Sequence, residues 1–227
     1  MTSSLPPIDT DLSDLLNRAR KVAVPTLGHY LEAGFADPDL QRISGKGTLV
    51  GRAVTVRISA TDSTALHHIV GLTGPGDVVV VDTGMDRRHA AVGEVVANAA
   101  ASQGTEGIIT DGPATDSAEL QKLGLVVHSR GTSALTTKLH GIDDFSFGQT
   151  ITCGGVAVNP GDIVLADQNG TLFVDPAVLT SILADAIQED LEEPDLIRQL
   201  WAGARLGDLT GATQVIKEHT ATATENG

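Results

Sequence analysis

The residues best suited to chemistry lie in the segment 111–119 (DGPATDSAE), which carries three carboxylates: Asp111, Asp116 and Glu119. Mg²⁺ prefers oxygen ligands, keeps several waters and is often held by one or two carboxylates. The segment follows the apolar run 107–110 (GIIT), and ligands of α/β sheets bind at the carboxyl ends of strands. The segment is therefore a candidate site for a hard cation such as Mg²⁺, with Asp111, Asp116 and Glu119 as its candidate ligands.

The same spacing has a structural interpretation. Asp116 followed three residues later by Glu119 is typical of a capping box, in which the first residue is the N-cap and the second lies at position N3. Spacing alone favours capping over metal binding. The two roles are compatible, because an N-cap carboxylate has a second oxygen free.

A second candidate is Gly93-Glu94-Val95-Val96, at the start of an Ala-rich stretch. If a helix begins here, its free N–H groups and the positive end of its dipole form an anion site. The carboxylate of a 2-oxo acid would fit such a site. A packed glycine beside a solvated glutamate explains the same residues, and the dipeptide alone favours that simpler interpretation.

Both candidates need a scaffold, and the hydrophobic pattern predicts one. Apolar, β-branched runs alternate with helical patterns in the middle of the chain, which favours parallel crossovers in an α/β layered fold. The predicted strands are 48–59, 77–82, 107–110 and 125–129, and the predicted helices are 63–72, 90–102 and 117–123. Short strands follow at 149–153, 156–158, 163–166 and 171–174, and then a helical region at 176–206.

The ends of the chain are more polar. We predict a helix at 12–20, with Asp9 or Asp11 as its cap, and a second short helix at 26–33. The predicted organisation is an N-terminal helical extension at 1–20, a single domain at 21–210 that includes the C-terminal helices, and a polar tail at 211–227 whose last ten or so residues we expect to fray. Two Pro-Gly-Asp turns, at 75–77 and 160–162, each open an apolar run.

Charge and composition exclude several classes of function. The net charge is −14 and no basic run is present, so we expect neither nucleic acid nor an anionic membrane as a partner. Cys153 is the only cysteine, which excludes an internal disulfide and a cysteine-ligated zinc site. Neither a signal peptide nor an apolar membrane span is visible, so we expect a cytoplasmic protein.

Four segments, taken in order, resemble one known family: GRAVTV at 51–56, GPGDVVVVD at 74–82, the stretch 93–116, and NPGDIVLADQNGTLFVDP at 159–176. That family is regulator of ribonuclease activity A, with the divalent-metal-dependent 4-hydroxy-4-methyl-2-oxoglutarate and 4-carboxy-4-hydroxy-2-oxoadipate aldolases. The resemblance covers about residues 20–210. It implies a layered α-β-β-α sandwich, assembled as a homotrimer or a homohexamer with active sites between subunits.

The resemblance also implies roles for individual residues. Gly93, Glu94, Val95 and Val96 would offer backbone amides to the substrate carboxylate, and Asp116 would anchor the metal. The family has an arginine where this chain has Thr115, so a cationic fork is replaced by one neutral hydroxyl. Loss of a charge-stabilising donor of that kind commonly lowers turnover by about two to three orders of magnitude.

Three functions follow. The first is a metal-dependent carbon–carbon lyase, an aldolase or decarboxylase of a small 2-oxo acid, in which Glu94 or a neighbouring subunit's carboxylate activates a water. Arg87 or Arg88 could then stand in for the missing arginine. The second keeps the fold and the metal but has a different lyase or hydratase substrate, because of Thr115. The third is a non-catalytic regulatory protein whose acidic surface binds a basic partner.

Overall fold

The computed structural model describes residues 5–225 of the chain. The chain divides into two compact units, one ending at Ala184 and one beginning at Asp185. This division falls inside the predicted domain 21–210. The candidate residues at 93–96 and 111–119 all lie in the first unit, which is described first.

The first unit is built on one mixed sheet. Strands β2 to β5 run parallel in the order β5-β4-β3-β2, and antiparallel strands extend both edges. The parallel strands are β2 (Leu49–Arg57), β3 (Asp77–Asp82), β4 (Gly107–Thr110) and β5 (Val126–Ser129). The antiparallel strands are β1 (Gln41–Ser44), β6 (Ser146–Phe147), β9 (Ile163–Ala166) and β10 (Thr171–Val174).

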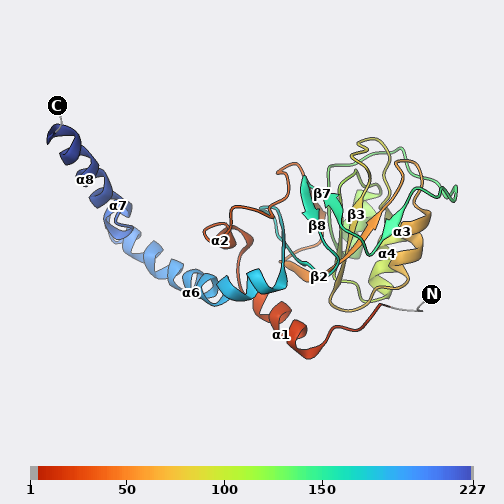
Figure 1. Ribbon diagram of the computed structural model, residues 1–227, viewed down its shortest axis with the longest axis horizontal. Helices are drawn as coiled ribbons and strands as arrows, with labels where there is room; N and C mark the ends of the chain where they lie inside the picture. The colour runs from red at the N-terminus through yellow and green to blue at the C-terminus, as the bar shows by residue number, and fades with distance from the viewer. Residues whose placement is uncertain (1–4, 226–227) are drawn as a thin grey trace. The chain divides into compact units, whose positions relative to one another are not determined.

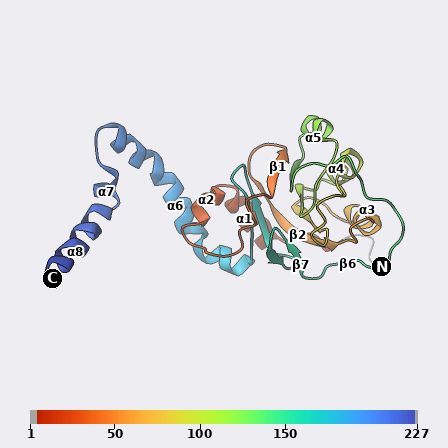
Figure 2. The same cartoon turned by 90° about the horizontal axis from the view of Figure 1, so that it is seen from above.

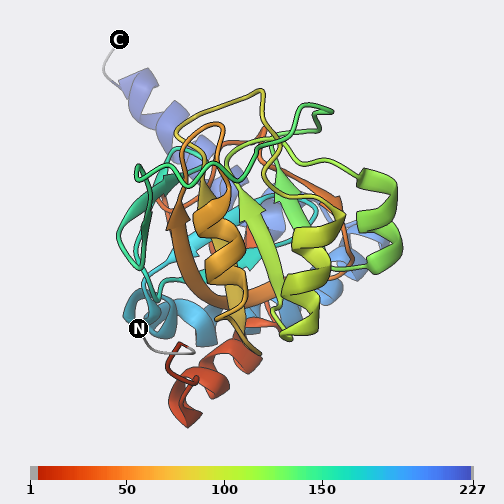
Figure 3. The ribbon, with the colours of Figure 1, turned by 90° about the vertical axis from the view of Figure 1, so that its right-hand side faces the viewer.

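Helices α3 (Thr64–Val70), α4 (Glu94–Ser102) and α5 (Ser117–Leu123) lie together on one face of the sheet (Figures 2 and 3). The hairpin of β7 (Ile151–Cys153) and β8 (Val156–Val158) lies on the other side of β3 (Figure 1). The predicted α/β fold is confirmed.

Strand β3 shows why its centre, residues 78–81, is an unbroken apolar run. Val79 and Val81 belong to the core under the helices, whereas Val78 and Val80 belong to the core under the hairpin. Side chains alternate between the faces of a strand, so a strand covered on both faces needs apolar residues at every position. Cys153 is fully buried in the second core, as a small apolar residue would be.

Some element boundaries differ from the predictions. Helix α4 begins at Glu94, four residues later than expected, because Ala90 and Val92 pair with Thr136 and Ala114 in isolated bridges. Helix α2 (Val24–Leu27) is shorter than expected. Helix α1 (Thr10–Ala19) begins after Asp9, whose Oδ1 accepts a hydrogen bond from the Leu12 N–H at 2.8 Å. Asp9 is therefore the cap, rather than Asp11.

The two Pro-Gly-Asp turns lie on either side of β2. The Arg52 N–H donates to the Gly76 carbonyl at 2.7 Å, and the Ala53 N–H donates to the Asp162 carbonyl at 2.7 Å. One turn opens β3, parallel to β2, and the other opens β9, antiparallel to it. The repeated motif is thus one kind of turn used at both edges of a central strand.

The C-terminal unit is helical. Helix α6 (Pro176–Trp201) begins in the first unit and contains Pro194 in its interior, and α7 (Leu206–Leu209) and α8 (Ala212–Glu225) follow. Helix α8 covers most of the predicted polar tail, and residues 226–227 of that tail lie outside the described residues. In the part of the chain that the structure describes, no helix is both long and apolar enough to cross a membrane.

One buried histidine makes stability depend on pH. His128 on β5 is fully buried; its Nδ1 lies 3.0 Å from the Thr171 hydroxyl, and its Nε2 has no partner among the described residues. Burial, followed by the charge of Arg42, lowers the pKa of His128 to about 4, against the opposite effect of Asp167. The folded state therefore disfavours the protonated imidazole.

We expect this stabilisation to be complete above the unfolded-state pKa of about 6.5, and to be lost as the pH falls from there toward 4. Between about pH 7.5 and pH 5, the free energy of unfolding should fall by about 2 kcal/mol more in the parent than in His128→Gln. Urea unfolding at the two pH values measures this difference. An equal fall in both proteins would refute the assignment.

Candidate functional site

Two loops at the carboxyl ends of β3 and β4 meet at one corner of the sheet. Val92 and Ala114 form an isolated parallel bridge, and the Thr115 N–H donates to the Val92 carbonyl at 2.9 Å. Immediately beyond this pairing, the Glu94 N–H donates to Asp116 Oδ2, also at 2.9 Å. The structure thus brings together the two segments that the sequence had singled out, 93–96 and 115–116.

Asp116 is the residue that joins them. Its backbone is left-handed, with φ of 53° and ψ of 41°, and it occupies the N-cap position of α5. The predicted capping bond to α5 is wrong, since no side-chain cap forms there. The carboxylate instead bonds to Glu94, the first residue of α4. A left-handed backbone is uncommon for residues other than glycine and often marks a functional site.

The start of α4 offers backbone donors beside this carboxylate. Ala97 is the first residue whose N–H bonds within the helix, to the Gly93 carbonyl at 3.0 Å. The preceding N–H groups of Val95 and Val96 have no acceptor inside the helix. Glu94 and Val95 are exposed, the latter at 75%. This end of α4 therefore carries open donors and a positive dipole end on the surface.

Thr115 lies half-buried against the same corner. Its hydroxyl donates to Asp116 Oδ1 at 3.3 Å. Both oxygens of Asp116 therefore accept a hydrogen bond, one from a backbone amide and one from a hydroxyl. The residue found in place of the family arginine supports the aspartate rather than adding a positive charge.

The other two predicted carboxylates lie elsewhere. Asp111 is buried, and its Oδ1 accepts bonds from Arg130 Nε at 2.7 Å and from the Gly154 N–H at 2.8 Å. Glu119 pairs with Lys122 at 3.7 Å on α5. Within residues 5–225, the structure gathers no group of three or more His, Cys, Asp or Glu side chains suited to a metal ion. Asp116 is thus the acid that the fold brings to the 93–96 segment.

An ion-pair network centred on Arg130 was not predicted from the sequence. Arg130 follows β5, and its side chain, only 4% exposed, bonds to Asp111, Asp37 and Asp39. Asp39 also accepts a bond from Arg87 at 2.9 Å. Arg87 is therefore already engaged in an ion pair, which weakens the idea that it replaces the missing arginine.

A long loop after β5 runs along the corner. The Ala114 N–H donates to the Gly131 carbonyl at 3.0 Å, and the Ser133 N–H donates to the Ala114 carbonyl at 2.8 Å.

Farther along the same loop, Asp62 accepts bonds from the N–H groups of His140 and Ile142. Burial raises the pKa of Asp62, but these two bonds, together with bonds from the Thr64 hydroxyl and N–H, outweigh it and hold that pKa well below its usual value. The loop is thus anchored by an ionised carboxylate.

Gly93 is needed because of what lies against it. A Cβ added there would be 2.6 Å from both Asp116 Oδ2 and Thr115 Cγ2. We expect Gly93→Ala to push the Asp116 carboxylate away from Glu94 and to destabilise the fold by about 1–3 kcal/mol. Gly71→Ala is the matched control, since its Cβ would meet only the His68 carbonyl at 3.5 Å. Equal stability of the two variants in urea would contradict this packing argument.

Known proteins share this architecture. The RraA-like family model, described as Aldolase/RraA, matches residues 10–173. A Hahella chejuensis protein provisionally named 4-hydroxy-4-methyl-2-oxoglutarate aldolase is 36% identical over 136 residues, 60% of this chain and 81% of that protein.

Two solved structures are similar in fold. One is Streptomyces coelicolor RraAS2, titled an unusual member of the RNase ES inhibitor RraA protein family. Its TM-score is 0.70 at 22% identity, over 85% of this chain and 100% of that one. The other is an uncharacterized protein from Pseudomonas syringae pv. tomato, with a TM-score of 0.76 at 18% identity, over 93% of this chain and 100% of that one.

Proposed function

Because the chain belongs to the RraA-like family, we propose that it is a divalent-metal-dependent carbon–carbon lyase, an aldolase or decarboxylase acting on a small 2-oxo acid. One observation carries the proposal: the Asp116 carboxylate is fixed by the Glu94 N–H at the open start of α4. A metal ion held by Asp116 would lie beside the anion-binding start of α4, as a 2-oxo acid requires.

The chain's own donors would bind the substrate carboxylate. The N–H groups of Val95 and Val96 have no helical acceptor and point out of the first turn of α4. A carboxylate bound there also gains from the helix dipole. Because these are backbone groups fixed by the fold, the substrate would be oriented without ordering a long side chain.

Asp116 is the residue that would hold the metal. Mg²⁺ and Mn²⁺ favour oxygen ligands, and Mg²⁺ in particular keeps several waters beside one or two carboxylates and substrate oxygens. A single exposed carboxylate fits an ion that takes its other ligands from water and substrate. When bound, such an ion acts as a Lewis acid that stabilises developing negative charge on the substrate oxygen.

Glu94 is the candidate for proton transfer. It is the first residue of α4, its side chain is exposed, and its own N–H bonds to Asp116. We propose that its carboxylate, or one from a neighbouring subunit, activates a water that carries the proton.

We further propose a homotrimer or homohexamer in the cytoplasm, with neither nucleic acid nor membrane as a partner. In the single chain, Glu94, Val95 and Asp116 are all exposed. A reactive enolate needs shielding from water, and a neighbouring subunit would supply it.

A different lyase or hydratase substrate is the second candidate, favoured by Thr115. Its hydroxyl bonds to Asp116 and adds no positive charge. The site therefore suits a less anionic substrate than a site with an arginine at this position would. The test is Thr115→Arg. If this variant gains oxaloacetate decarboxylation that the parent lacks, the parent acts on another substrate.

The proposed function is tested by pyruvate release from oxaloacetate and from 4-hydroxy-2-oxo diacids, with Mg²⁺ or Mn²⁺ and again after chelation. We expect release that depends on the metal. If metal-loaded protein releases no pyruvate from any of these substrates, the lyase proposal fails, and a regulatory binding role becomes the better account.

A further inference from the structure

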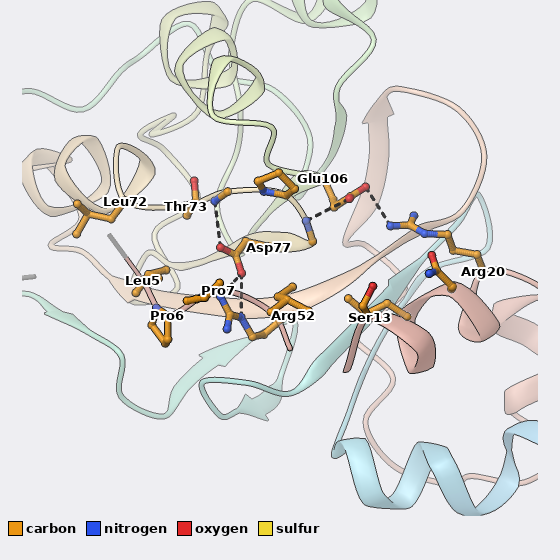
Figure 4. Close-up of a pocket in the computed structure, with 16 residues that line it drawn as sticks. Leu5, Pro6, Pro7, Ser13, Arg20, Arg52, Leu72, Thr73, Asp77 and Glu106 are labelled. Atoms are coloured by element: carbon orange, nitrogen blue, oxygen red, sulfur yellow. Dashed lines mark hydrogen bonds and ion pairs between the residues drawn. The ribbon is translucent and has the colours of Figure 1, made fainter. Parts of the chain in front are cut away.

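A separate cavity of about 540 Å³ lies at the opposite end of the parallel strands, where β3 begins (Figure 4). It is lined by α1, by the turn before β3 and by the segment 5–8. The corner at Asp116 follows the other ends of β3 and β4, so the two places do not overlap. The volume of the cavity is within the range of small-molecule sites.

Arg52 brings the first charged group to this cavity. Its Nε and Nη2 lie 2.9 and 2.7 Å from Asp77 Oδ1, and Asp77 Oδ2 accepts a bond from the Gly74 N–H at 3.1 Å. The Arg52 side chain is 15% exposed. Its remaining N–H groups have no acceptor among the described residues, and the residue lines the cavity. The ion pair therefore holds Arg52 in place without using all its donors.

Arg20 reaches the same cavity from α1 (Figure 4). Its Nη2 lies 3.2 Å from Glu106 Oε2, and Glu106 Oε1 accepts a bond from the Gly76 N–H at 3.2 Å. Two arginines and two carboxylates thus make the lining neutral as a whole. The spare guanidinium donors point to an anion, and the two carboxylates limit how much negative charge it can carry.

The remaining lining is largely apolar. Leu5, Pro6 and Pro7 cover one side, and Leu16 and Leu72 add to the walls. The Leu5 N–H donates to the Leu72 carbonyl at 3.2 Å, which ties the N-terminal segment down at this point. A ligand that satisfies the whole lining therefore needs an apolar body as well as acceptor oxygens.

We propose that this cavity binds a small monocarboxylic acid with an apolar body. The carboxylate accepts from the spare N–H groups of Arg52, and the body lies against Leu5, Pro6 and Leu72. The positive charge of Arg20 offsets the carboxylates of the lining. Inorganic phosphate is a poorer ligand, because its second negative charge meets Asp77 and Glu106 and it leaves the apolar walls without a contact. The site does not depend on the proposed lyase function.

The probe is benzoate, titrated into the full-length protein by calorimetry. We expect saturable binding with a Kd of about 1 mM or tighter. Asn17→Phe adds a bulky ring at the α1 wall and should weaken binding at least about tenfold. Asp14→Phe, an exposed position on the same helix that does not line this cavity, is the matched control and should bind as the parent does. Circular dichroism checks that both variants fold.

Three further measurements decide the location and the chemistry. Arg20→Gln should weaken benzoate binding severalfold, whereas Asp116→Asn should leave it unchanged. Inorganic phosphate should give no saturable heat. The proposal is overturned if benzoate shows no saturation up to about 10 mM, if Asn17→Phe binds as the parent does, or if Asp116→Asn removes the binding. The last result would place benzoate at the α4 corner instead.

Discussion

Replacing Asp116 with asparagine is expected to lower kcat for metal-dependent pyruvate release at least about 100-fold. The asparagine oxygen can still accept the hydrogen bond from the Glu94 N–H, which the aspartate accepts at 2.9 Å, so the corner should keep its shape. The negative charge that would hold a divalent cation is lost. A steady-state assay across metal concentrations measures the effect, and thermal unfolding should show a nearly unchanged midpoint.

Glu119→Gln is the matched control for this prediction. Glu119 lies three residues after Asp116 but pairs with Lys122 on the exposed side of α5, and a surface pair of this kind contributes at most about 1 kcal/mol. We expect its turnover to stay within about twofold of the parent. If Glu119→Gln were as damaging as Asp116→Asn, Glu119 would be a metal ligand. If both variants were fully active, the Asp116 assignment would fail.

Replacing Arg130 with methionine is expected to lower the free energy of unfolding by about 3–5 kcal/mol. The Arg130 side chain is 4% exposed and that of Asp111 is 3% exposed. Removing the cation therefore leaves a buried carboxylate with only the Gly154 N–H as its hydrogen-bond donor among the described residues. Urea unfolding measures the loss, and the slope with urea shows whether the transition remains two-state.

Arg87→Met tests whether burial, rather than the number of ion pairs, decides this cost. Arg87 contacts Asp39 in the same network, but the two side chains are 52% and 57% exposed. We expect a loss below about 1 kcal/mol. Similar losses in Arg87→Met and Arg130→Met would contradict the argument. The double variant Asp111→Asn/Arg130→Met should be less destabilised than Arg130→Met alone, because its buried group is no longer charged.

The central strands could be predicted because their sequences carry a strong local signal. The runs at 77–82 and 107–110 have Val and Ile at their centres, and both match β3 and β4 residue for residue. Strand β1 (Gln41–Ser44) could not be found in this way, because it is a polar edge strand in which only Ser44 is buried. Its place is set by pairing with β5, which local patterns do not encode.

The candidate site was likewise predictable from the sequence only in part. The position of Asp116 after a buried strand followed from a general rule for α/β sheets. Its bond to α4 did not, because that bond depends on a left-handed backbone at Asp116 and on the meeting of two loops. Arg130 was missed because its partners Asp37 and Asp39 are more than ninety positions away in the chain. The absence of an arginine at Thr115 was visible only through the family resemblance.

The most direct test of the central claim is Mn²⁺ binding in the presence of oxalate, followed by the electron paramagnetic resonance signal of free Mn²⁺. Oxalate resembles the planar enolate of a 2-oxo acid and should bridge the metal at Asp116 and the Val95 and Val96 N–H groups. The account predicts that oxalate tightens Mn²⁺ binding in the parent, and that Asp116→Asn weakens the complex at least about tenfold. Equal Mn²⁺ affinity in the two proteins would contradict it.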